Sequence, residues 1–218
     1  MNIIILLGPP ASGKGTQSLI LSKLLDIHHI SIGDIFRKNY KNKTKLGLLV
    51  NNFIKKGLLV TDDITNSMIS DFLTQEKINK GIILDGYPRN INQGRFLTEE
   101  LQKKNVNLTK VFYFNVAEKL LEKRIMGRMI CPQCGEIYHK ETKLPQKHGF
   151  CDNDNNALIQ RQDDNIDVFN QRLLVYKKET LPLVEYYKQM NKIFEIKVDD
   201  THKSIQDITA IMLKELQK

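Results

Sequence analysis

Hydrophobic and polar residues along this chain follow two periodic patterns. Short apolar runs, most of them ending at Gly, Pro or Asp, predict buried strands at residues 2–7, 81–88, 110–116 and 193–198. Apolar residues recur at helical spacing just after the first strand, at residues 46–56, 62–73, 117–128 and 168–190, and from about residue 204. Strands that alternate with helices predict an α/β fold, with a parallel sheet flanked by helices on both faces.

Two segments depart from this simple alternation. Residues 29–38 predict a strand end, a Ser-Gly-Asp turn and the start of a helix. Residues 129–165 are poor in apolar side chains and rich in Cys, Gly, Asn and Asp. This second segment is therefore expected to be an insertion with a small core of its own.

Composition narrows the class of protein. Hydrophobic residues make up 41% of the 218 residues, which is ordinary for a folded chain with a buried core. The apolar run at residues 3–7 has no basic flank and leads into Gly-Pro-Pro, so it predicts a strand rather than a signal peptide or membrane span. All three cysteines fall between residues 131 and 151, which argues against a secreted disulfide scaffold. We therefore expect a cytoplasmic protein without a membrane segment.

Positive charge is in excess, at a formal net charge of +8, and its distribution between lysine and arginine is uneven. Lysine supplies most of it as generic solvated charge, whereas arginine is the better bidentate binder of phosphate. Each arginine therefore needs an explanation of its own. Only seven of the 33 basic residues are arginines: Arg37, Arg89, Arg95, Arg124, Arg128, Arg161 and Arg172.

The stretch GPPASGKGT at residues 8–16 has the spacing of a phosphate-binding loop, and it lies between a predicted strand and a predicted helix. Glycines let backbone N–H groups converge on phosphate oxygens, the helix N-terminus adds positive potential, and Lys14 adds a point charge. The strict motif has Ser or Thr directly after the lysine. Here Gly15 intervenes and Thr16 follows one position later.

Further motifs follow in order along the chain. They are GKGTQ at 13–17, SIGDIFR at 31–37, GLLVTDD at 57–63, LDGYPRNINQ at 84–93, RIMGR at 124–128 and RQDDN at 161–165. Over nearly all 218 residues this series resembles the adenylate kinases, and in particular their bacterial, zinc-containing type with a long lid. Six of the seven arginines fall on phosphate-binding positions of that family, and Arg95 is interpreted as a surface residue.

The resemblance implies the fold of a P-loop nucleoside monophosphate kinase and the reversible, Mg²⁺-dependent reaction ATP + AMP = 2 ADP, which serves adenine nucleotide homeostasis. It divides the chain into a core (1–30, 61–126 and 165–218), an AMP-binding insertion (31–60) and a lid (127–164). Both insertions would close over the substrates and exclude water. The transfer needs no histidine base, so the five histidines are expected to be exposed or structural.

The resemblance also implies the site residues. The catalytic set is Lys14, Arg89, Arg124, Arg128, Arg161, Arg172, Asp163 and Asp164. The ATP-binding set is Ala11, Ser12, Gly13, Lys14, Gly15, Thr16, Arg128, Ile137 and Tyr138. The AMP-binding set is Ile32, Arg37, Leu58, Leu59, Val60, Gly86, Tyr87, Pro88, Arg89, Gln93, Arg161 and Arg172. Asp85, at the end of a predicted strand, is the carboxylate expected nearest to Mg²⁺.

Within these sets the resemblance assigns separate roles. It places Arg37, Arg89 and Arg172 at the AMP phosphate, and Gln93 at the AMP base. It places Arg124, Arg128 and Arg161 around the ATP phosphates and the transferring group. One position departs from the family, because Ile32 stands where Thr is usual and cannot offer AMP a hydroxyl. We expect altered AMP contacts there without a change of reaction.

The cysteines predict a structural zinc site. CPQCG at residues 131–135 has the form of a zinc knuckle, and Cys151 opens a second half after a suitable spacing. On ligand chemistry alone His148 is favoured as the fourth ligand, with His139 and Asp152 less well placed. The resemblance favours Asp154, which completes Cys-x-x-Asp. Four protein ligands would leave no open position for catalysis, so the zinc would hold together a lid that has little core.

Two other functions compete with this interpretation. A zinc knuckle in a basic chain can bind nucleic acid, but few basic residues alternate with aromatics here and the phosphate loop would be unexplained. A kinase that prefers GTP as the donor, or another nucleoside monophosphate kinase, is the nearer alternative. We expect a monomer with ATP, AMP and ADP as its partners, and neither nucleic acid nor membrane.

Overall fold

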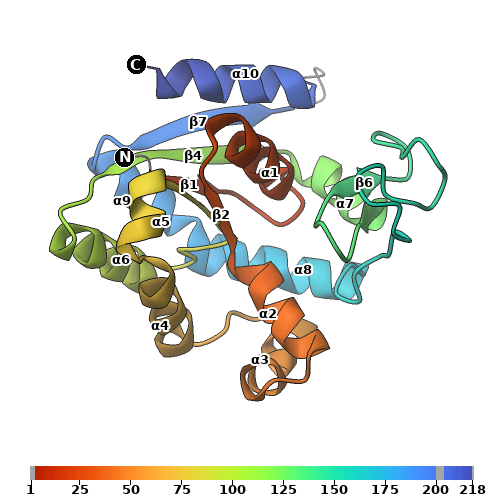
Figure 1. Cartoon of the computed structure of the whole chain (residues 1–218), viewed down its shortest axis with the longest axis horizontal. Coiled ribbons are helices and arrows are strands. Elements are labelled where there is room, and N and C mark those ends of the chain that lie inside the picture. Colours follow the sequence, from red (N-terminus) through yellow and green to blue (C-terminus); the bar gives the residue numbers. More distant parts are fainter. Residues whose placement is uncertain (1–2, 200–203, 218) are drawn as a thin grey trace.

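A five-stranded parallel sheet forms the centre of the computed structural model, which describes residues 3–199 and 204–217 (Figure 1). The strands, in their order across the sheet, are β2 (His28–Ser31), β3 (Ile82–Asp85), β1 (Ile3–Leu7), β4 (Leu108–Val116) and β7 (Ile193–Val198). Strand β1 is central, since its Leu6 aligns with Asp85 on one side and Phe112 on the other. All the carboxyl ends therefore meet at one edge of the sheet.

Side chains of β1 alternate between the two faces of the sheet and enter two different cores. Ile3, Ile5 and Leu7 pack in one cluster, and Ile4 and Leu6 pack in the other. Because both faces are covered, the strand is apolar throughout instead of alternating with polar residues. This explains why a continuous apolar run was the correct signal for a strand.

Helices cover both faces, as the alternation predicted. One cluster receives side chains from α1 (Lys14–Leu25), α7 (Glu118–Met126), α8 (Ile166–Val175) and α10 (Ile205–Leu216). The other cluster receives side chains from α2 (Ile32–Lys41), α3 (Lys45–Lys55), α4 (Asp62–Phe72), α6 (Ile91–Lys103) and α9 (Pro182–Gln189). A short helix, α5 (Gln75–Lys80), leads into β3. Figure 1 shows α1 and α10 on one side of the sheet, with α4 and α6 on the other.

The predicted Ser-Gly-Asp turn at residues 31–34 is wrong, because β2 passes directly into α2. Ser31 ends the strand and serves as the N-cap of the helix, with its side chain accepting from the N–H of Asp34 at 3.4 Å. A serine cap satisfies one of the free N–H groups at a helix start, so no separate turn is needed. The short connection places Asp34 in the first turn of α2, at the sheet edge where the strands end.

The helical stretch at residues 168–190 consists of three pieces. A π-helical turn, η1 (Tyr176–Thr180), separates α8 from α9. Pro182 begins α9 and has no N–H to donate into the preceding turn, which is a local reason for the change in backbone geometry. Thr180 at the end of η1 donates its hydroxyl to the carbonyl of Arg89 at 2.7 Å. The irregular turn thus contacts the segment that carries a predicted site residue.

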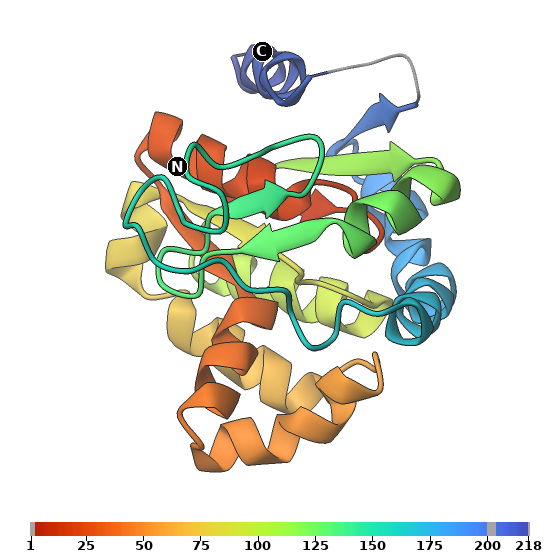
Figure 2. The same cartoon turned by 90° about the vertical axis from the view of Figure 1, so that its right-hand side faces the viewer.

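Residues 127–164 contain a small antiparallel sheet of β5 (Arg128–Ile130) and β6 (Ile137–His139), followed by long loops (Figure 2). Cys131, Tyr138 and Cys151 form a buried cluster here, with Met129 and Leu158 packed against it. The expectation of a small separate core in this segment is confirmed.

In the described part of the chain, no helix combines the length and apolar character needed to cross a membrane.

Candidate active site

A large cleft of about 2120 Å³ lies along the edge where the parallel strands end. Lys14 and the six predicted phosphate-binding arginines all line it. They come from segments as distant in sequence as α1, α2, α7 and α8, so only the fold brings them together. The carboxyl edge of an open parallel sheet is a common place for a ligand site.

The loop at residues 8–16 is built by backbone conformations that suit glycine. Gly13 has φ +96° and is the N-cap of α1, which begins at Lys14. Gly8 lies so close to β4 that an added Cβ would stand 2.9 Å from the carbonyl oxygen of Phe114. The tight passage from β1 to α1 directs the helix N-terminus into the cleft, as anion binding requires.

The ammonium of Lys14 folds back on this loop. Its Nζ donates to the carbonyls of Gly8 and Pro9, at 2.7 and 2.6 Å, and to Ser12 Oγ at 3.1 Å. Burial lowers the pKa of Lys14 to about 7, against the opposing effect of the Asp85 carboxylate, while nearby arginines lower it further. A polyanion in the cleft would reverse this shift, because it favours the charged ammonium.

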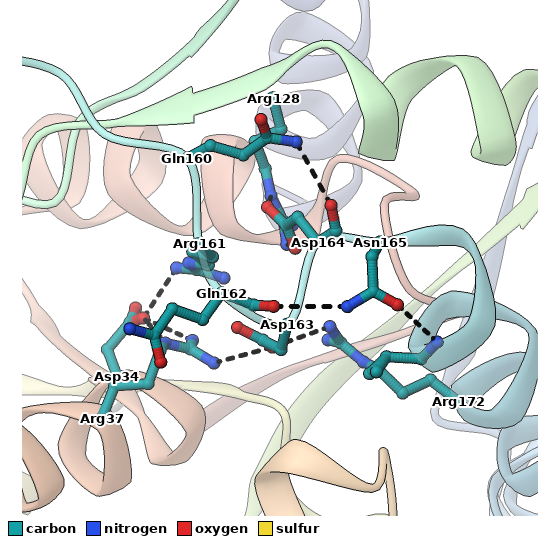
Figure 3. Close-up of polar contacts among 11 residues, drawn as sticks. Asp34, Arg37, Arg128, Gln160, Arg161, Gln162, Asp163, Asp164, Asn165 and Arg172 are labelled. Carbon is teal, nitrogen blue, oxygen red and sulfur yellow. Dashed lines mark hydrogen bonds and ion pairs between the residues drawn. The ribbon is translucent and has the colours of Figure 1, made fainter.

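Figure 3 shows arginines and carboxylates alternating where α2 meets residues 160–165. Asp34 Oδ1 accepts from two guanidinium groups, that of Arg37 at 2.6 Å and that of Arg161 at 2.7 Å. Burial would raise the pKa of Asp34, but these two cations hold it far below its usual value. The pair Asp34–Arg161 joins residues 127 positions apart in the sequence.

The two predicted aspartates continue this network. Asp163 pairs with Arg172 at 3.0 Å and with Arg37 at 3.7 Å, and Asp164 pairs with Arg128 through both carboxylate oxygens. Burial would raise the pKa of Asp163, but the surrounding arginines lower it below its ordinary range. Asp163 is thus held as an anion, and both carboxylates pair with arginines and orient them.

Burial also affects the arginines themselves. It lowers the pKa of Arg172 to about 9 and that of Arg161 to about 10, with neighbouring guanidinium groups adding to the effect. Arg89 and Arg124 form no ion pair within residues 3–199 and 204–217. Arg89 Nε donates to the Gly86 carbonyl at 2.9 Å, and Arg124 donates to the Ser12 carbonyl at 3.3 Å. Such crowding of buried cations favours binding of a polyanion.

A smaller pocket adjoins the cleft between α2, α3 and β3. It is lined by nine members of the predicted AMP-binding set: Ile32, Arg37, Leu58, Leu59, Val60, Gly86, Arg89, Gln93 and Arg172. Gln93 is buried and its amide is already oriented, since it accepts from the N–H of Arg89 at 2.8 Å and donates to Asp62 at 2.7 Å. The Ile32 side chain is 3% exposed and packs in the core.

The other predicted AMP-binding residues lie beside this pocket. Pro88 lines the main cleft. The Tyr87 ring is buried in the core, and its hydroxyl donates to Asn66 at 2.7 Å. Burial raises the pKa of Tyr87 well above its usual value. Tyr87 therefore packs in the core next to the pocket and does not line it.

Asp85 lies at the end of β3 and faces the phosphate loop. Its Oδ2 would stand 3.5 Å from a Cβ built on Gly15, and 3.7 Å separates it from Nε2 of His29. Burial would raise the pKa of Asp85, but His29 and Lys14 hold it below its usual value. An ionised carboxylate beside a phosphate loop fits the surroundings of a Mg²⁺–nucleotide complex.

The cysteine segment brings together the four predicted zinc ligands. The donor atoms of Cys131, Cys134, Cys151 and Asp154 all lie within 4.8 Å of one another. Cys134 Sγ is 3.5 Å from Cys151 Sγ, and the Asp154 carboxylate is 3.2 Å from Cys131 Sγ. His148 is exposed and does not belong to the group. Three thiols and a carboxylate form a donor set suited to zinc.

The backbone around these side chains forms two matching turns. Gly135 N–H donates to the Cys131 carbonyl at 3.1 Å, and Asn155 N–H donates to the Cys151 carbonyl at 2.9 Å. Gly135 and Asn155 both have positive φ, at 78° and 54°. In the first turn, two N–H groups also point at Cys131 Sγ, from 3.4 and 3.5 Å. N–H donors to sulfur favour a thiolate, which is the form that binds metal.

Some contributors to the site were not found from the sequence. Asp34 was interpreted only as part of a turn, although its carboxylate joins α2 to Arg161. Asp62 and Asn90 orient Gln93, the first by accepting from it and the second by capping α6. His29 faces Asp85. The signal that could have pointed to His29 and Asp34 is their place within and just after β2, near the edge where the parallel strands end.

Comparison with known proteins agrees with the geometry. The family model described as "Adenylate kinase" matches residues 6–192. The adenylate kinase of Aster yellows witches'-broom phytoplasma (strain AYWB) is 52% identical over 215 residues, covering 99% of this chain and 98% of the relative. That of Onion yellows phytoplasma (strain OY-M) is 50% identical with the same coverage, and that of Acholeplasma laidlawii (strain PG-8A) is 42% identical, again with the same coverage. The similarity spans the cleft and the cysteine segment alike.

Proposed function

The chain belongs to the adenylate kinase family, the ATP:AMP phosphotransferases, and from this premise we propose how the residues of its cleft divide the reaction ATP + AMP = 2 ADP between them. The observation that carries the proposal is the convergence of Lys14 and six arginines on one cleft. Phosphoryl transfer needs two polyanions aligned, their developing charge stabilised and water excluded. A ring of fixed cations from separate elements meets the first two needs.

On the ATP side, residues Ala11 to Thr16 hold the phosphates through backbone N–H groups, and Lys14 leaves its loop carbonyls to bind them. Arg124 and Arg128 stabilise the transferring phosphoryl group. Support comes from Arg124, which reaches the phosphate loop at Ser12, and from the Asp164 carboxylate that holds Arg128. Ile137 and Tyr138 border the nucleotide from the lid, and both line the cleft.

On the AMP side, Arg37, Arg89 and Arg172 bind the phosphate, and Arg161 lies between the two substrates. Gln93 reads the base, and residues Leu58 to Val60 meet the ring through their backbone. The smaller pocket next to Arg37, Arg89 and Arg172 supports this division, because it offers a mostly apolar wall beside three cations. Its fixed Gln93 amide gives the wall a directional polar group.

The family implies Mg²⁺ bound with ATP, and the ion would neutralise phosphate charge. Asp85 is the residue of this chain that would lie nearest to it. Its carboxylate is ionised and faces Gly15 of the phosphate loop, which fits an ion held mainly by phosphates and water.

We also propose a structural zinc in the lid, with Cys131, Cys134, Cys151 and Asp154 as ligands. Asp154→Ala is expected to lose bound zinc, and His148→Ala is expected to keep it, when metal content is measured after purification. Zinc retained in the first variant and lost in the second would exclude Asp154. Because all four ligands come from the protein, this metal supports the lid and does not take part in the transfer.

Two segments would move during turnover, residues 31–60 on the AMP side and 127–164 on the ATP side, with the remaining residues as a stable core. Their closure would exclude water from the transferring group. The contacts of Asp34 with Arg161 and of Arg37 with Asp163 already join the two segments across the cleft. We propose that the enzyme acts as a cytoplasmic monomer that binds nucleotides and neither nucleic acid nor membrane.

A coupled assay of ADP formation tests the proposal. With AMP as acceptor, ATP should support turnover and GTP should support much less. A rate with GTP that exceeds the rate with ATP would establish the alternative donor. Turnover with neither donor would overturn the assignment of these residues to phosphoryl transfer.

A further inference from the structure

His139, the last residue of β6, contacts the point where α7 ends and the lid begins. It aligns with Arg128, the first residue of β5. Its ring Nδ1 faces two N–H groups, those of Glu141 at 3.1 Å and Thr142 at 3.2 Å. Because Nδ1 must accept from both, the ring proton lies on Nε2, and Nε2 donates to the Lys123 carbonyl at 3.3 Å. Both ring nitrogens are therefore used in contacts with the backbone.

The carbonyl that His139 binds belongs to the last turn of α7. Most carbonyls in this turn lack the N–H partners that they would have in the middle of a helix, but Lys123 O keeps its partner, the Gly127 N–H, at 3.2 Å. The His139 ring adds a second donor to this carbonyl, at 3.3 Å. A histidine donor at a helix C-terminus stabilises the helix end. His139 thus joins β6 to the end of α7.

The absence of a side chain at Gly127 leaves room for the His139 ring. Its backbone angles, φ −91° and ψ −2°, are open to any residue, so conformation does not require glycine here. A Cβ at this position would overlap Nε2 and Cε1 of the His139 ring. Lys140 N–H adds a backbone bond to the Gly127 carbonyl at 2.9 Å. The glycine therefore provides space for the imidazole.

Two arginines of the cleft lie on either side of this contact. Arg124 belongs to α7 and reaches the phosphate loop, whereas Arg128 begins β5 and pairs with Asp164. The backbone between them passes through Gly127, against which His139 packs. We propose that His139 is a positioning residue that sets the direction of Arg128 relative to Arg124, by joining β6 to the end of α7. This inference rests on the proposed function of the two arginines.

Two substitutions separate the contacts of the ring. In His139→Gln the amide nitrogen can replace Nε2 at Lys123, but nothing accepts from Glu141 and Thr142. In His139→Asn the side-chain oxygen can replace Nδ1 at these two N–H groups, but the side chain cannot reach Lys123. His139→Ala removes both contacts.

Steady-state kinetics with ATP and AMP then distinguish a positioning role of His139 from a direct contact between His139 and ATP. For His139→Asn and His139→Ala we expect kcat to fall roughly tenfold, because misaligned arginines stabilise the transition state less, while the ATP KM changes by less than about twofold. His139→Gln should keep kcat within about threefold of wild type. A raised ATP KM at unchanged kcat, or wild-type kinetics in all three variants, would overturn the proposal. So would a kcat retained by Asn and lost by Gln.

A second series of variants changes Gly127, the residue against which the His139 ring packs. Gly127→Ala should displace the ring and reproduce the kinetics of His139→Ala. Gly127→Ala combined with His139→Ala should be no slower than His139→Ala alone, because the ring that collides with the new methyl group is gone. Additive losses in the double variant would contradict the proposed contact.

Amide hydrogen exchange measures the same contacts without activity. The Lys140 amide should exchange faster in His139→Asn and Gly127→Ala and stay protected in His139→Gln. The Glu141 and Thr142 amides should show the reverse order between Asn and Gln. If the wild-type protein forms no ADP, the proposed function fails, and exchange still decides whether His139 joins β6 to α7. The expected exchange pattern with unchanged kinetics would leave the contact in place and overturn its positioning role.

Discussion

The two segments that border the cleft, residues 31–60 and 127–164, are stabilised by different kinds of interaction. On the proposed AMP side, residues 31–60 form α2 and α3 and send Ile32, Phe36, Val50 and Val60 into one of the main cores. On the proposed ATP side, residues 127–164 have a separate cluster of three buried side chains. The first segment is therefore stabilised with the whole protein. The second depends on local devices, namely the proposed zinc and the contacts at Gly127.

The largest effect is expected from removing the proposed zinc ligands. Cys131→Ser, or removal of zinc by a chelator, should reduce ADP formation at least tenfold, because a structural zinc site contributes about 10 kcal/mol to the folding of its segment. Limited proteolysis should then cut within residues 127–164 and leave α2 and α3 intact. Restoring zinc to the chelated protein is the control. Full activity and an uncut lid without metal would remove the distinction between the two sides.

The next effect concerns the AMP side. Val50 on α3 is fully buried, so Val50→Ala should lower the free energy of unfolding of the whole protein by about 2 kcal/mol in urea denaturation. Leu49→Ala is the matched control, since Leu49 is 57% exposed and should cost little. If Val50→Ala loosens only residues 31–60 and leaves global unfolding unchanged, this segment is as independent as the lid.

The pH dependence of nucleotide binding should differ between ATP and AMP. Lys14 has a pKa of about 7 in the free protein, and phosphates beside it raise this value. At pH 8 the free lysine is mostly neutral and the bound one charged, so ATP binding should take up nearly one proton. Affinity for ATP should then fall, at most about tenfold per pH unit, as pH rises above 7.

Calorimetry in buffers of different ionisation enthalpy measures this uptake. Lys14→Met should abolish it, and AMP alone should cause much less. Equal uptake for both nucleotides would show that the buried lysine does not belong to one side of the cleft.

The smallest effect is expected at Ile32. Ile32→Thr places a hydroxyl at the proposed AMP pocket and removes apolar contact from the core, so the free energy of unfolding should fall by about 1 kcal/mol. The AMP KM should decrease by about threefold or less while the ATP KM stays constant. Ile32→Val controls for the lost methyl group. An unchanged AMP KM in steady-state kinetics would show that isoleucine at this position is silent.

Local patterns predicted much of this fold. The apolar runs located β1, β3, β4 and β7, and the glycine-rich loop was placed correctly before α1. These features depend on residues that are neighbours in sequence, so periodicity and turn chemistry suffice. The family resemblance added the arginines, which come together only in the folded chain.

Contacts between segments that are distant in the sequence could not be predicted from it. Asp34 and Arg161 have ordinary local surroundings, and nothing in either stretch specifies their pairing. His139 was named as a less suitable zinc ligand and, with the other histidines, was expected to be exposed or structural, but the sequence did not predict that both its nitrogens bind the backbone. The space that Gly127 leaves for the ring depends on how β6 packs against α7. Such choices are fixed by three-dimensional packing.

The shared carboxylate of Asp34 has a consequence for the salt dependence of binding. Arg37 and Arg161 already hold one anion between them, so an arriving phosphate exchanges with a tethered carboxylate instead of adding to bare charge. Because Asp34 neutralises part of the arginine charge, the local net charge is less positive than the arginines alone suggest. A phosphate that replaces this carboxylate therefore displaces fewer mobile counterions. The sensitivity of nucleotide affinity to ionic strength should therefore be weaker than six converging arginines would give in open solvent.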